Sequence, residues 1–399
     1  MLNVLAVLPN LTWDDVLSPH IYVFYGAFLL SFIFTPLMRA VAITYGIVDS
    51  PDRVRKFHTA PVAYLGGVAV SLGWVAGLAI SQLHLVAPEV GTHLRVKLSI
   101  VAGGGVIVAL GLWDDLRHIR PRLKIVGQVI AALLLLTQHV GTNCLGPVLS
   151  PLQVRLHDLI GPDFNIPQWL IGFLSSITVI LIVVGCSNAT NLLDGLDGLC
   201  GGVTAVIGAG YLFLAVHLAT QSLDPDWDMV RIILSLALLG SVLGFVPYNF
   251  NPASIFMGDA GSMFLGYACA VMIILMGQEQ PKWFMAAMVM FALPVLDTSL
   301  AFARRWVNRR PFFSADRHHF HHQLLARGYS IRKTVVISYL LAVAFCVLGA
   351  MMVFIRARYA VAVYMVIFGS IIVAAYKMGM VHERQMLAER ESAARTPVS

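Results

Sequence analysis

Long apolar runs alternate with short polar segments along almost the whole chain. A transmembrane helix needs about 20 consecutive apolar residues, and eleven runs approach that length. They lie at 20–43, 64–86, 96–112, 125–141, 167–187, 199–218, 230–248, 260–277, 283–303, 334–355 and 359–379. The third and fourth runs are short, and the last two are separated only around Arg356 and Arg358, so ten spans are the alternative. The pattern predicts an all-α integral membrane protein with about eleven transmembrane helices.

Composition supports the bilayer as the solvent of this chain. Of the 399 residues, 58% are hydrophobic and only 12% are charged, whereas about a quarter of residues are charged in soluble domains. The first fifteen residues lack the positive segment of a cleavable signal peptide, so the first run is expected to be a retained span. The five cysteines are dispersed and form no C-x-x-C pair, which argues against a disulfide framework or a zinc knuckle.

Lysine and arginine assign the two sides of the membrane. With the N-terminus outside, twenty basic residues fall in cytoplasmic segments and seven on the other side, as the positive-inside rule requires. This topology explains the net charge of +6 without a nucleic-acid partner. No repeat or low-complexity linker divides the chain, so we expect one transmembrane domain over 1–380 and a polar cytoplasmic tail over 381–399. Segment 142–166 is expected to be an ordered outer loop or hairpin.

Five polar motifs fall on the cytoplasmic side under this topology. They are the segments 51–58, 113–116 with Lys124, 188–202, 249–259 and 316–322. Polar groups at membrane depth are costly and tend to mark function. The topology therefore predicts an active site on the cytoplasmic face.

Asp114 and Asp115 end the third run as adjacent carboxylates. Two such groups ionise together only near a cation or in water, and hard oxygen ligands of this kind suit Mg²⁺. The alternative is a solvated helix end beside Arg117 and Arg120.

Segment 188–199 repeats polar side chains at every third position, which makes them neighbours on a helix. They are Asn188, Asn191, Asp194 and Asp197. Gly195 and Gly198 indicate that the helix breaks and exposes its backbone, as a phosphate or nucleotide site requires. A glycine-rich turn between two helices is the alternative.

Asp259 precedes another apolar run and has no cation near it in the sequence. A metal ion or a lysine from elsewhere in the chain would relieve the cost of its charge. Phe256, three residues earlier, offers an aromatic face on which a base could stack; an apolar anchor at the helix end is the alternative.

Four histidines lie within five residues of the most basic loop, at 318, 319, 321 and 322. Contact with phosphate groups, together with nearby arginines, explains them better than zinc, because immediate neighbours cannot all face one tetrahedral ion. A solvated basic loop is the third interpretation. Asp297, inside the ninth run, is expected to pair with Arg304 or Arg305 and is given no catalytic role.

These motifs together resemble the polyprenyl-phosphate N-acetylhexosamine-1-phosphate transferase superfamily over nearly the whole chain. In the family's order they are Arg55-Lys56-Phe57-His58 to Gly66-Gly67, Asp114-Asp115 with Lys124, Asn188–Gly198, Phe256–Asp259 and the histidine motif. Each is modestly specific, and the set is very specific. The nearest functional alternative from another class, a nucleotide-sugar transporter, would place charges near the midplane and often shows inverted repeats. A catalytically dead membrane scaffold would have little reason to retain the carboxylates.

The resemblance implies an eleven-helix type of membrane fold, Mg²⁺ dependence with Mn²⁺ as a substitute, and release of UMP. Asp259, with Asn191, would coordinate the Mg²⁺ that bridges the pyrophosphate. Asp114 and Asp115 would lie beside the lipid phosphate, either as its base or as orienting groups. Lys124 would contact phosphate.

The resemblance also implies a larger set of substrate-binding residues. Lys56, Asp197, Asn249 and Phe256 fall where the family holds uridine, and His319, His321 and His322 match positions near the diphosphate. Asn188 and Asp194 complete the set. Phe320 stands where the family often has Ile or Leu, which leaves these roles unaffected.

The branch of the family follows from two local differences. The histidine motif continues into Gln323-Leu324-Leu325, and the first loop has the Arg-Lys-x-His form. Both features resemble enzymes that use UDP-GlcNAc to start O-antigen, enterobacterial common antigen or teichoic acid chains. This implies a multi-pass GlcNAc-1-phosphate transferase acting on undecaprenyl phosphate in a bacterial cytoplasmic membrane. Phospho-MurNAc-pentapeptide transfer or another UDP-HexNAc donor is the alternative, and a homodimer is one option for assembly.

Overall fold

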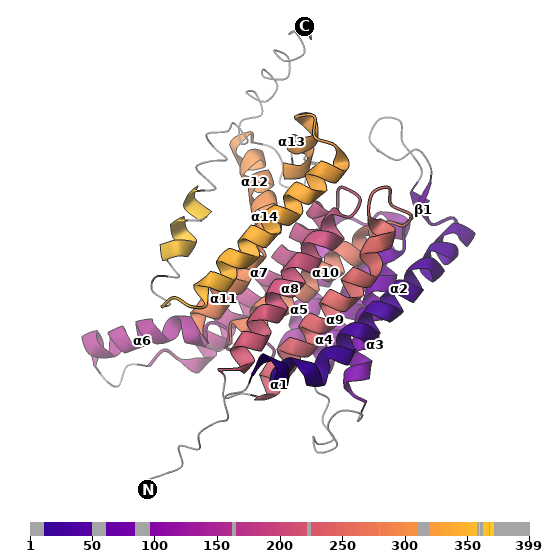
Figure 1. Cartoon of the computed structure of the whole chain (residues 1–399). Coiled ribbons are helices and arrows are strands. Elements are labelled where there is room, and N and C mark those ends of the chain that lie inside the picture. Colours follow the sequence, from indigo (N-terminus) through magenta and orange to yellow (C-terminus); the bar gives the residue numbers. More distant parts are fainter. Residues whose placement is uncertain are drawn as a thin grey trace.

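The computed structural model describes most of the chain as helices packed side by side (Figure 1). The described residues are 12–49, 61–83, 96–161, 165–221, 225–278, 280–309, 319–356, 359, 362–366 and 368–370. The N-terminal part contains α1 (Trp13–Leu17), the 3₁₀ helix η1 (Ser18–His20), α2 (Ile21–Thr44), β1 (Val48–Asp49), β2 (Val62–Ala63), α3 (Gly66–Ser81), α4 (Leu98–Arg117), α5 (Pro121–Thr137) and α6 (Gly146–Ile160). The remainder contains α7 (Gln168–Leu193), α8 (Leu199–Ala219), α9 (Pro225–Asn249), α10 (Gly258–Met276), α11 (Pro281–Met290), α12 (Ala292–Val307), α13 (Phe320–Ala326) and α14 (Ile331–Met352).

The chain is an all-α membrane protein, as its apolar runs predict. Seven described helical segments are long and apolar enough to cross a bilayer, or eight if α11 and α12 form one bent span. The predicted count of eleven is not reached among the described residues. The helices α3 and α5 coincide with predicted spans but are only 16 and 17 residues long, and the eleventh run lies mostly outside the described residues. The count of eleven and the orientation remain predictions.

Helix α10 is the centre of the bundle. Its residues 260–276 are all buried, and it packs against α7, α4 and α3. Small residues permit these close approaches. A Cβ atom at Gly67 of α3 would lie 2.0 Å from the backbone nitrogen of Gly261, and one at Gly111 of α4 would lie 2.4 Å from the Cα atom of Ala260. The backbones of α3 and α4 are thereby held against the first turn of α10.

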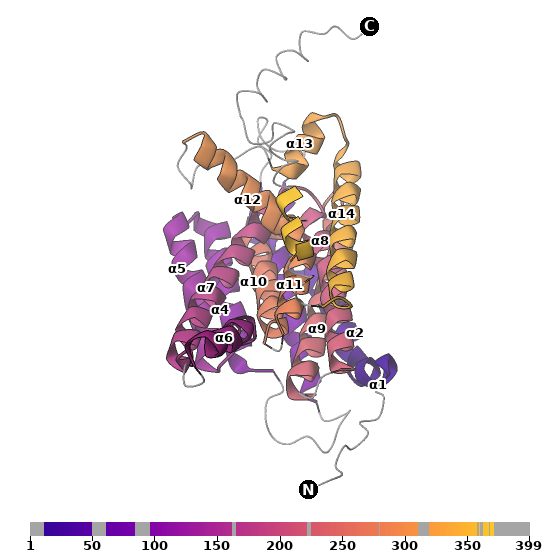
Figure 2. The same ribbon diagram turned by 90° about the vertical axis from the view of Figure 1, so that its left-hand side faces the viewer.

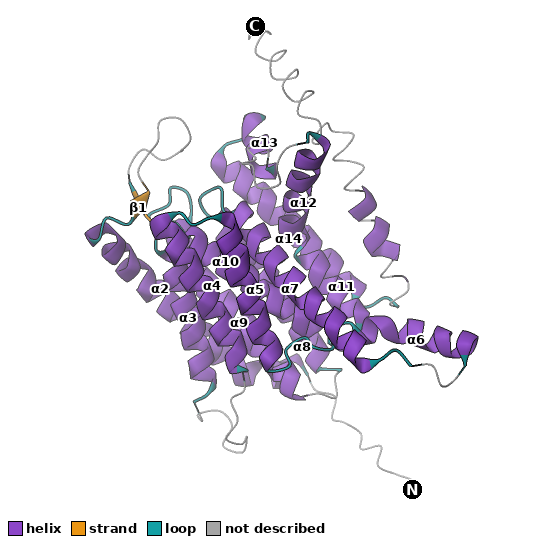
Figure 3. Cartoon of the chain, turned by 180° about the vertical axis from the view of Figure 1, so that it is seen from behind, coloured by secondary structure: helices purple, strands orange, loops and turns teal. Residues whose placement is uncertain are grey.

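Two features interrupt the bundle. Helix α12 departs from α11 by 73° at a break near Phe291, so that it leans away from the other helices (Figure 2). Helix α6, in the predicted outer loop, extends sideways from the bundle (Figure 3) near the end where α1 lies (Figure 1) and buries none of its residues. The short strand β1, the helix α13 and the free ends of α12 and α2 lie at the opposite end (Figure 3).

Candidate functional site

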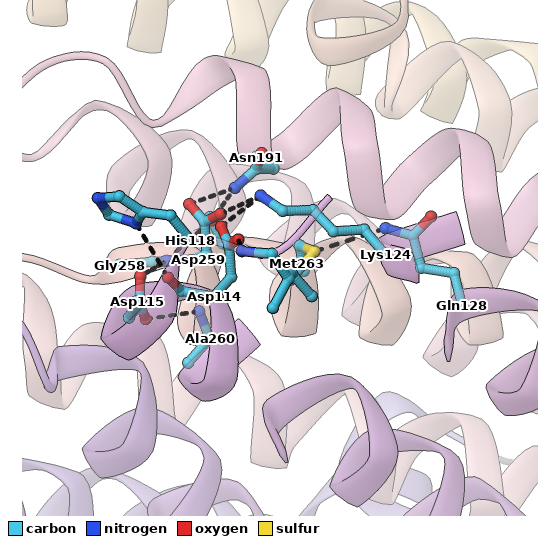
Figure 4. Close-up of polar contacts among 12 residues, drawn as sticks. Asp114, Asp115, His118, Lys124, Gln128, Asn191, Gly258, Asp259, Ala260 and Met263 are labelled. Carbon is cyan, nitrogen blue, oxygen red and sulfur yellow. Dashed lines mark hydrogen bonds and ion pairs between the residues drawn. The ribbon is translucent and has the colours of Figure 1, made fainter. Parts of the chain in front are cut away.

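Four helix ends meet at the end of the bundle that carries β1 and α13. Asp114 and Asp115 belong to the last turn of α4, and Lys124 belongs to the first turn of α5. Asn191 lies in the last turn of α7, and Asp259 is the second residue of α10. Figure 4 shows these side chains pointing toward one another. Predicted site residues from three separate motifs thus form one cluster.

Asp115 holds the first turn of α10. One of its carboxylate oxygens accepts a hydrogen bond from the backbone N–H of Asp259 at 2.8 Å, and the other accepts from Ala260 at 3.1 Å. The first N–H groups of a helix have no partner within the helix, and a carboxylate at this position is favoured by the helix dipole. Gly258, with a φ of +72°, makes this approach possible, because a Cβ there would lie 2.7 Å from the Asp115 Oδ2 atom.

Lys124 forms ion pairs with two carboxylates at once. Its Nζ atom lies 2.5 Å from the Asp114 Oδ2 atom and 2.5 Å from the Asp259 Oδ2 atom. The other oxygen of Asp114 accepts the backbone N–H of Ile119 at 2.8 Å. Asp114 is buried, so the interpretation of a solvated helix end is wrong for it. The lysine is the distant cation that the sequence around Asp259 lacks.

Asn191 completes the surroundings of Asp259. Its side-chain Nδ2 donates to the Asp259 Oδ1 atom at 2.9 Å and to the Ser262 hydroxyl at 3.0 Å, which leaves its amide oxygen for another partner. Asn188, one turn earlier, instead donates to the Gln128 Oε1 atom at 2.7 Å. Asn188 therefore links α7 to α5, one helical turn away from the carboxylate cluster.

Asp194 follows α7 at the start of the glycine-containing turn. Burial raises the pKa of its carboxyl group to about 8, and the negative charges of Asp259, Asp115 and Asp197 act in the same direction. The group therefore retains a proton at neutral pH unless a cation approaches it.

Asp197 and Asn249 organise the segment that leads into α10. Asp197 accepts hydrogen bonds from the Asn251 side chain at 2.9 Å and from the backbone N–H of Ala253 at 3.0 Å. Asn249 accepts from the backbone N–H of Gly198 at 3.1 Å and donates to the Ile255 carbonyl at 3.0 Å. The turn that contains Asp197 and Gly198 and the segment 249–255 are thus hydrogen-bonded to each other, beside the carboxylate cluster.

The first predicted motif is seen only in part. Lys56 and its neighbours in 50–60 lie outside the described residues. The following segment reaches the site through its backbone, since the N–H of Gly66 donates to the Phe256 carbonyl at 2.9 Å and the Phe256 N–H donates to the Ala63 carbonyl at 2.8 Å. The Phe256 ring is half-buried and meets the Tyr64 ring edge-on, with centroids 6.0 Å apart. Its role as a platform for a base remains a prediction.

Two histidines of the motif are buried beside the turn that follows α7. His319 is 5% exposed and His321 is 1% exposed, so a solvated loop does not describe them. A Cβ at Gly195 would lie 2.3 Å from the His321 Nε2 atom, which places this ring directly on the turn between Asp194 and Asp197. Burial, followed by the charge of His322, lowers the pKa of His321 to about 3, so its ring is neutral.

Asp297 was expected to pair with an arginine, and this expectation is wrong. Its Oδ2 atom lies 3.0 Å from the His319 Nδ1 atom, and its Oδ1 atom accepts the backbone N–H of Phe320 at 2.8 Å. The cause is the break before α12, which turns Asp297 toward the histidine motif. The only signal in the sequence was an acidic residue inside an apolar run, which does not reveal its partner.

The donor atoms of the cluster suit a hard cation. Among the described residues, no group of three or more His, Cys, Asp or Glu side chains is arranged to hold a metal ion. Mg²⁺, however, usually takes only one or two carboxylates and completes its shell with water and substrate phosphates. Asp114 and Asp259 already converge on a positive charge, that of Lys124. Asp259 and the free amide oxygen of Asn191 are the oxygen donors that could hold such an ion.

Comparison with known proteins gives a consistent result. Residues 97–277 match the model of glycosyl transferase family 4, and this region contains every member of the carboxylate cluster. A probable undecaprenyl-phosphate N-acetylglucosaminyl 1-phosphate transferase of Bacillus subtilis is 31% identical over 84% of this chain and 85% of its own length.

Two further relatives show the range of the similarity. A decaprenyl-phosphate N-acetylglucosaminephosphotransferase of Mycolicibacterium smegmatis is 29% identical over 79% of this chain and 77% of its own. A phospho-N-acetylmuramoyl-pentapeptide-transferase of Rubrobacter xylanophilus is 31% identical over 72% of this chain and 82% of its own.

Proposed function

This chain belongs to glycosyl transferase family 4, and from that premise we propose that it transfers N-acetylglucosamine 1-phosphate from UDP-GlcNAc to undecaprenyl phosphate. UMP is released, and the product starts a lipid-linked glycan of the bacterial cell envelope. The observation that carries the proposal is the cluster of Asp114, Asp115, Lys124, Asn191 and Asp259 at one end of a membrane-spanning bundle. Phosphoryl transfer depends on positioning and charge neutralisation, and this cluster provides both.

In this reaction an oxygen of the lipid phosphate attacks the β-phosphorus of the UDP-sugar in line. The bond from that phosphorus to the oxygen bridging the two phosphates breaks, and UMP leaves. A phosphate monoester has a second pKa of about 6, so much of the lipid phosphate is already doubly ionised at neutral pH. Asp115, whose two oxygens accept backbone N–H groups, is suited to orient the start of α10, and Asp114 remains beside the reacting phosphate.

Lys124 neutralises phosphate charge in this proposal. In the described structure it bridges Asp114 and Asp259, and in the presence of substrate its three N–H groups can turn to phosphate oxygens. Mg²⁺ held by Asp259 and Asn191 would stabilise the negative charge of the departing UMP. Asp197, Asn249 and Phe256 would border the uridine, with the histidines near the diphosphate.

The proposed location is the bacterial cytoplasmic membrane, with the cluster facing the cytoplasm. It is supported by the excess of basic residues in the segments at this end and by the source of the nucleotide sugar inside the cell. The excess of carboxylates at one end of the bundle, without an inverted repeat, favours an enzyme over a transporter.

The donor is tested by measuring UMP release from a panel of UDP-sugars with purified protein, undecaprenyl phosphate and Mg²⁺. We expect activity with UDP-GlcNAc and little with UDP-MurNAc-pentapeptide. Activity confined to the pentapeptide donor would place the chain in the other branch. Absence of UMP with every donor would overturn the enzyme assignment.

A further inference from the structure

A buried acid–histidine pair connects the bent span to the histidine motif. Asp297 lies in the second turn of α12 and is only 3% exposed. Its two carboxylate oxygens bind two consecutive residues, the ring of His319 at 3.0 Å and the backbone N–H of Phe320 at 2.8 Å. A buried carboxylate is costly unless it is hydrogen-bonded, so the pair holds His319 and Phe320 in one arrangement.

The pairing determines which atom of His319 is free to act. Its Nδ1 atom is used by Asp297, so only the Nε2 atom remains for another partner. A carboxylate on one ring nitrogen fixes both the tautomer and the orientation of the imidazole. The ring is therefore set before any ligand arrives.

The His321 side of the histidine motif packs against the turn between Asp194 and Asp197. The His319 and His321 rings are stacked, with centroids 5.7 Å apart and planes 6° apart, and His321 lies against Gly195. The motif is thus wedged between Asp297 of α12 and the turn that carries Asp194 and Asp197. Loss of the Asp297 contact would free the histidine motif on its α12 side.

We infer that Asp297 is a positioning residue that acts through His319, fixing the ring so that its Nε2 atom meets the diphosphate of the nucleotide sugar. This inference rests on the proposed function. The break between α11 and α12 has a role in it, because the break is what brings a residue of the ninth apolar run to the histidine motif.

The test compares Asp297→Asn, His319→Gln and the double variant of the full chain in UMP release with UDP-GlcNAc. Asparagine can still accept the Phe320 N–H, but it carries no charge for the His319 ring. We expect Asp297→Asn to raise the KM for UDP-GlcNAc at least tenfold, in the range of about 10–100-fold typical of lost supporting contacts. The double variant should be no more than about twofold worse than His319→Gln, because residues that act through one another are not additive.

Asp228→Asn is the matched control. It removes another buried carboxylate, which pairs with Arg231 at the other end of the bundle. We expect it to lower the thermal midpoint and to leave the KM unchanged. Effects of Asp297→Asn and His319→Gln that multiply in the double variant, or a wild-type KM in Asp297→Asn, would overturn the inference.

Two further measurements keep the outcome decisive. Asp297→Glu retains the charge and should recover part of the KM lost in Asp297→Asn. If Asp297→Asn does not fold, Asp297→Ser takes its place in the comparison, with the same expected rise in KM. Hydrogen exchange of segment 319–326 requires no activity: Asp297→Ala should accelerate it and Asp228→Asn should not. If wild-type protein releases no UMP with any donor, the proposed function fails, while the exchange result still decides whether Asp297 positions the motif.

Discussion

Both ends of α10 are met by charged side chains that are wholly or partly buried, but the two ends are arranged differently. At its C-terminus, Arg231 of α9 donates to the Leu275 carbonyl at 3.1 and 3.0 Å and forms an ion pair with Asp228 at 2.8 Å. At its N-terminus, Lys124 pairs with Asp114 and Asp259, and Asp115 accepts the backbone N–H groups of the first turn. Each end carries the sign of charge that the helix dipole favours.

The difference lies in the balance of charge. At the C-terminal end the ion pair seen among the described residues joins one carboxylate to one guanidinium, which is an arrangement that holds helices together. At the N-terminal end Asp114, Asp115 and Asp259 outnumber Lys124, so full ionisation of the three carboxyl groups would call for a further cation. An excess of acidic over basic side chains therefore distinguishes the end suited to chemistry from the end suited to stability.

The largest expected effect on turnover is that of Asp259→Asn. This change removes a carboxylate that binds Lys124 and is proposed to hold Mg²⁺, while nearly preserving the shape of the side chain. We expect turnover to fall by about 10²–10³-fold, as for the loss of one electrostatic group in a catalytic site. UMP release across a Mg²⁺ titration measures this, and normal turnover with unaltered Mg²⁺ dependence would contradict the assignment.

Lys124→Met tests the positive partner of the same cluster. Asp114 and Asp259 would then lose the cation that they share. We expect turnover to fall by about 10–10²-fold and higher Mg²⁺ to recover part of it. Turnover independent of Mg²⁺ concentration in this variant would argue that the metal does not share the carboxylates with Lys124.

Asp194→Asn should affect turnover by about tenfold or less, because asparagine resembles the protonated carboxyl group that predominates at pH 7. The pH dependence of stability is the sharper measurement. The pKa of Asp194 is near 8 in the folded chain and about 4 when unfolded, so the folded state binds more protons between these values and wild-type stability falls as pH rises from about 4 to 8.

The substitution removes this dependence. In the absence of substrate, the thermal midpoint of Asp194→Asn should equal that of wild type near pH 4. It should rise relative to the wild-type midpoint as pH increases from 4 to 8. Parallel curves for the two proteins across this interval would contradict the raised pKa.

Asp228→Asn should have the smallest effect on turnover. Arg231 would lose its carboxylate partner in a buried position, which destabilises the helix packing. We expect a lower thermal midpoint, by about 2–4 °C for each kcal/mol lost, with kcat and KM of the folded enzyme within about twofold of wild type. A change in KM for the donor would show that the two ends of α10 are coupled, and the contrast between them would then fail.

Much of the architecture was predictable because apolar runs are a local property. The predicted run 260–277 and the observed α10 differ by two residues at most, and the run 199–218 differs from α8 by one. Helix α7 continues six residues beyond the predicted run 167–187. Alternation of the runs also implies which polar segments share a membrane side, and the described parts of the predicted motifs meet at one end. The helix break of 73° was not predicted, although the run 283–303 carries a signal for it: Pro294 cannot donate a hydrogen bond to the carbonyl of Met290, next to the break.

The amino-acid sequence by itself determined that this chain is a helical membrane protein and which residue types carry its chemistry, since both follow from hydropathy and short motifs. Tertiary structure alone decided the partners: Lys124 with Asp114 and Asp259, Asp115 with the first turn of α10, and Asp297 with His319. The physical reason is that hydrogen bonds and ion pairs act over about 3 Å, and these partners, which are up to 145 positions apart, reach that distance only when the helices pack.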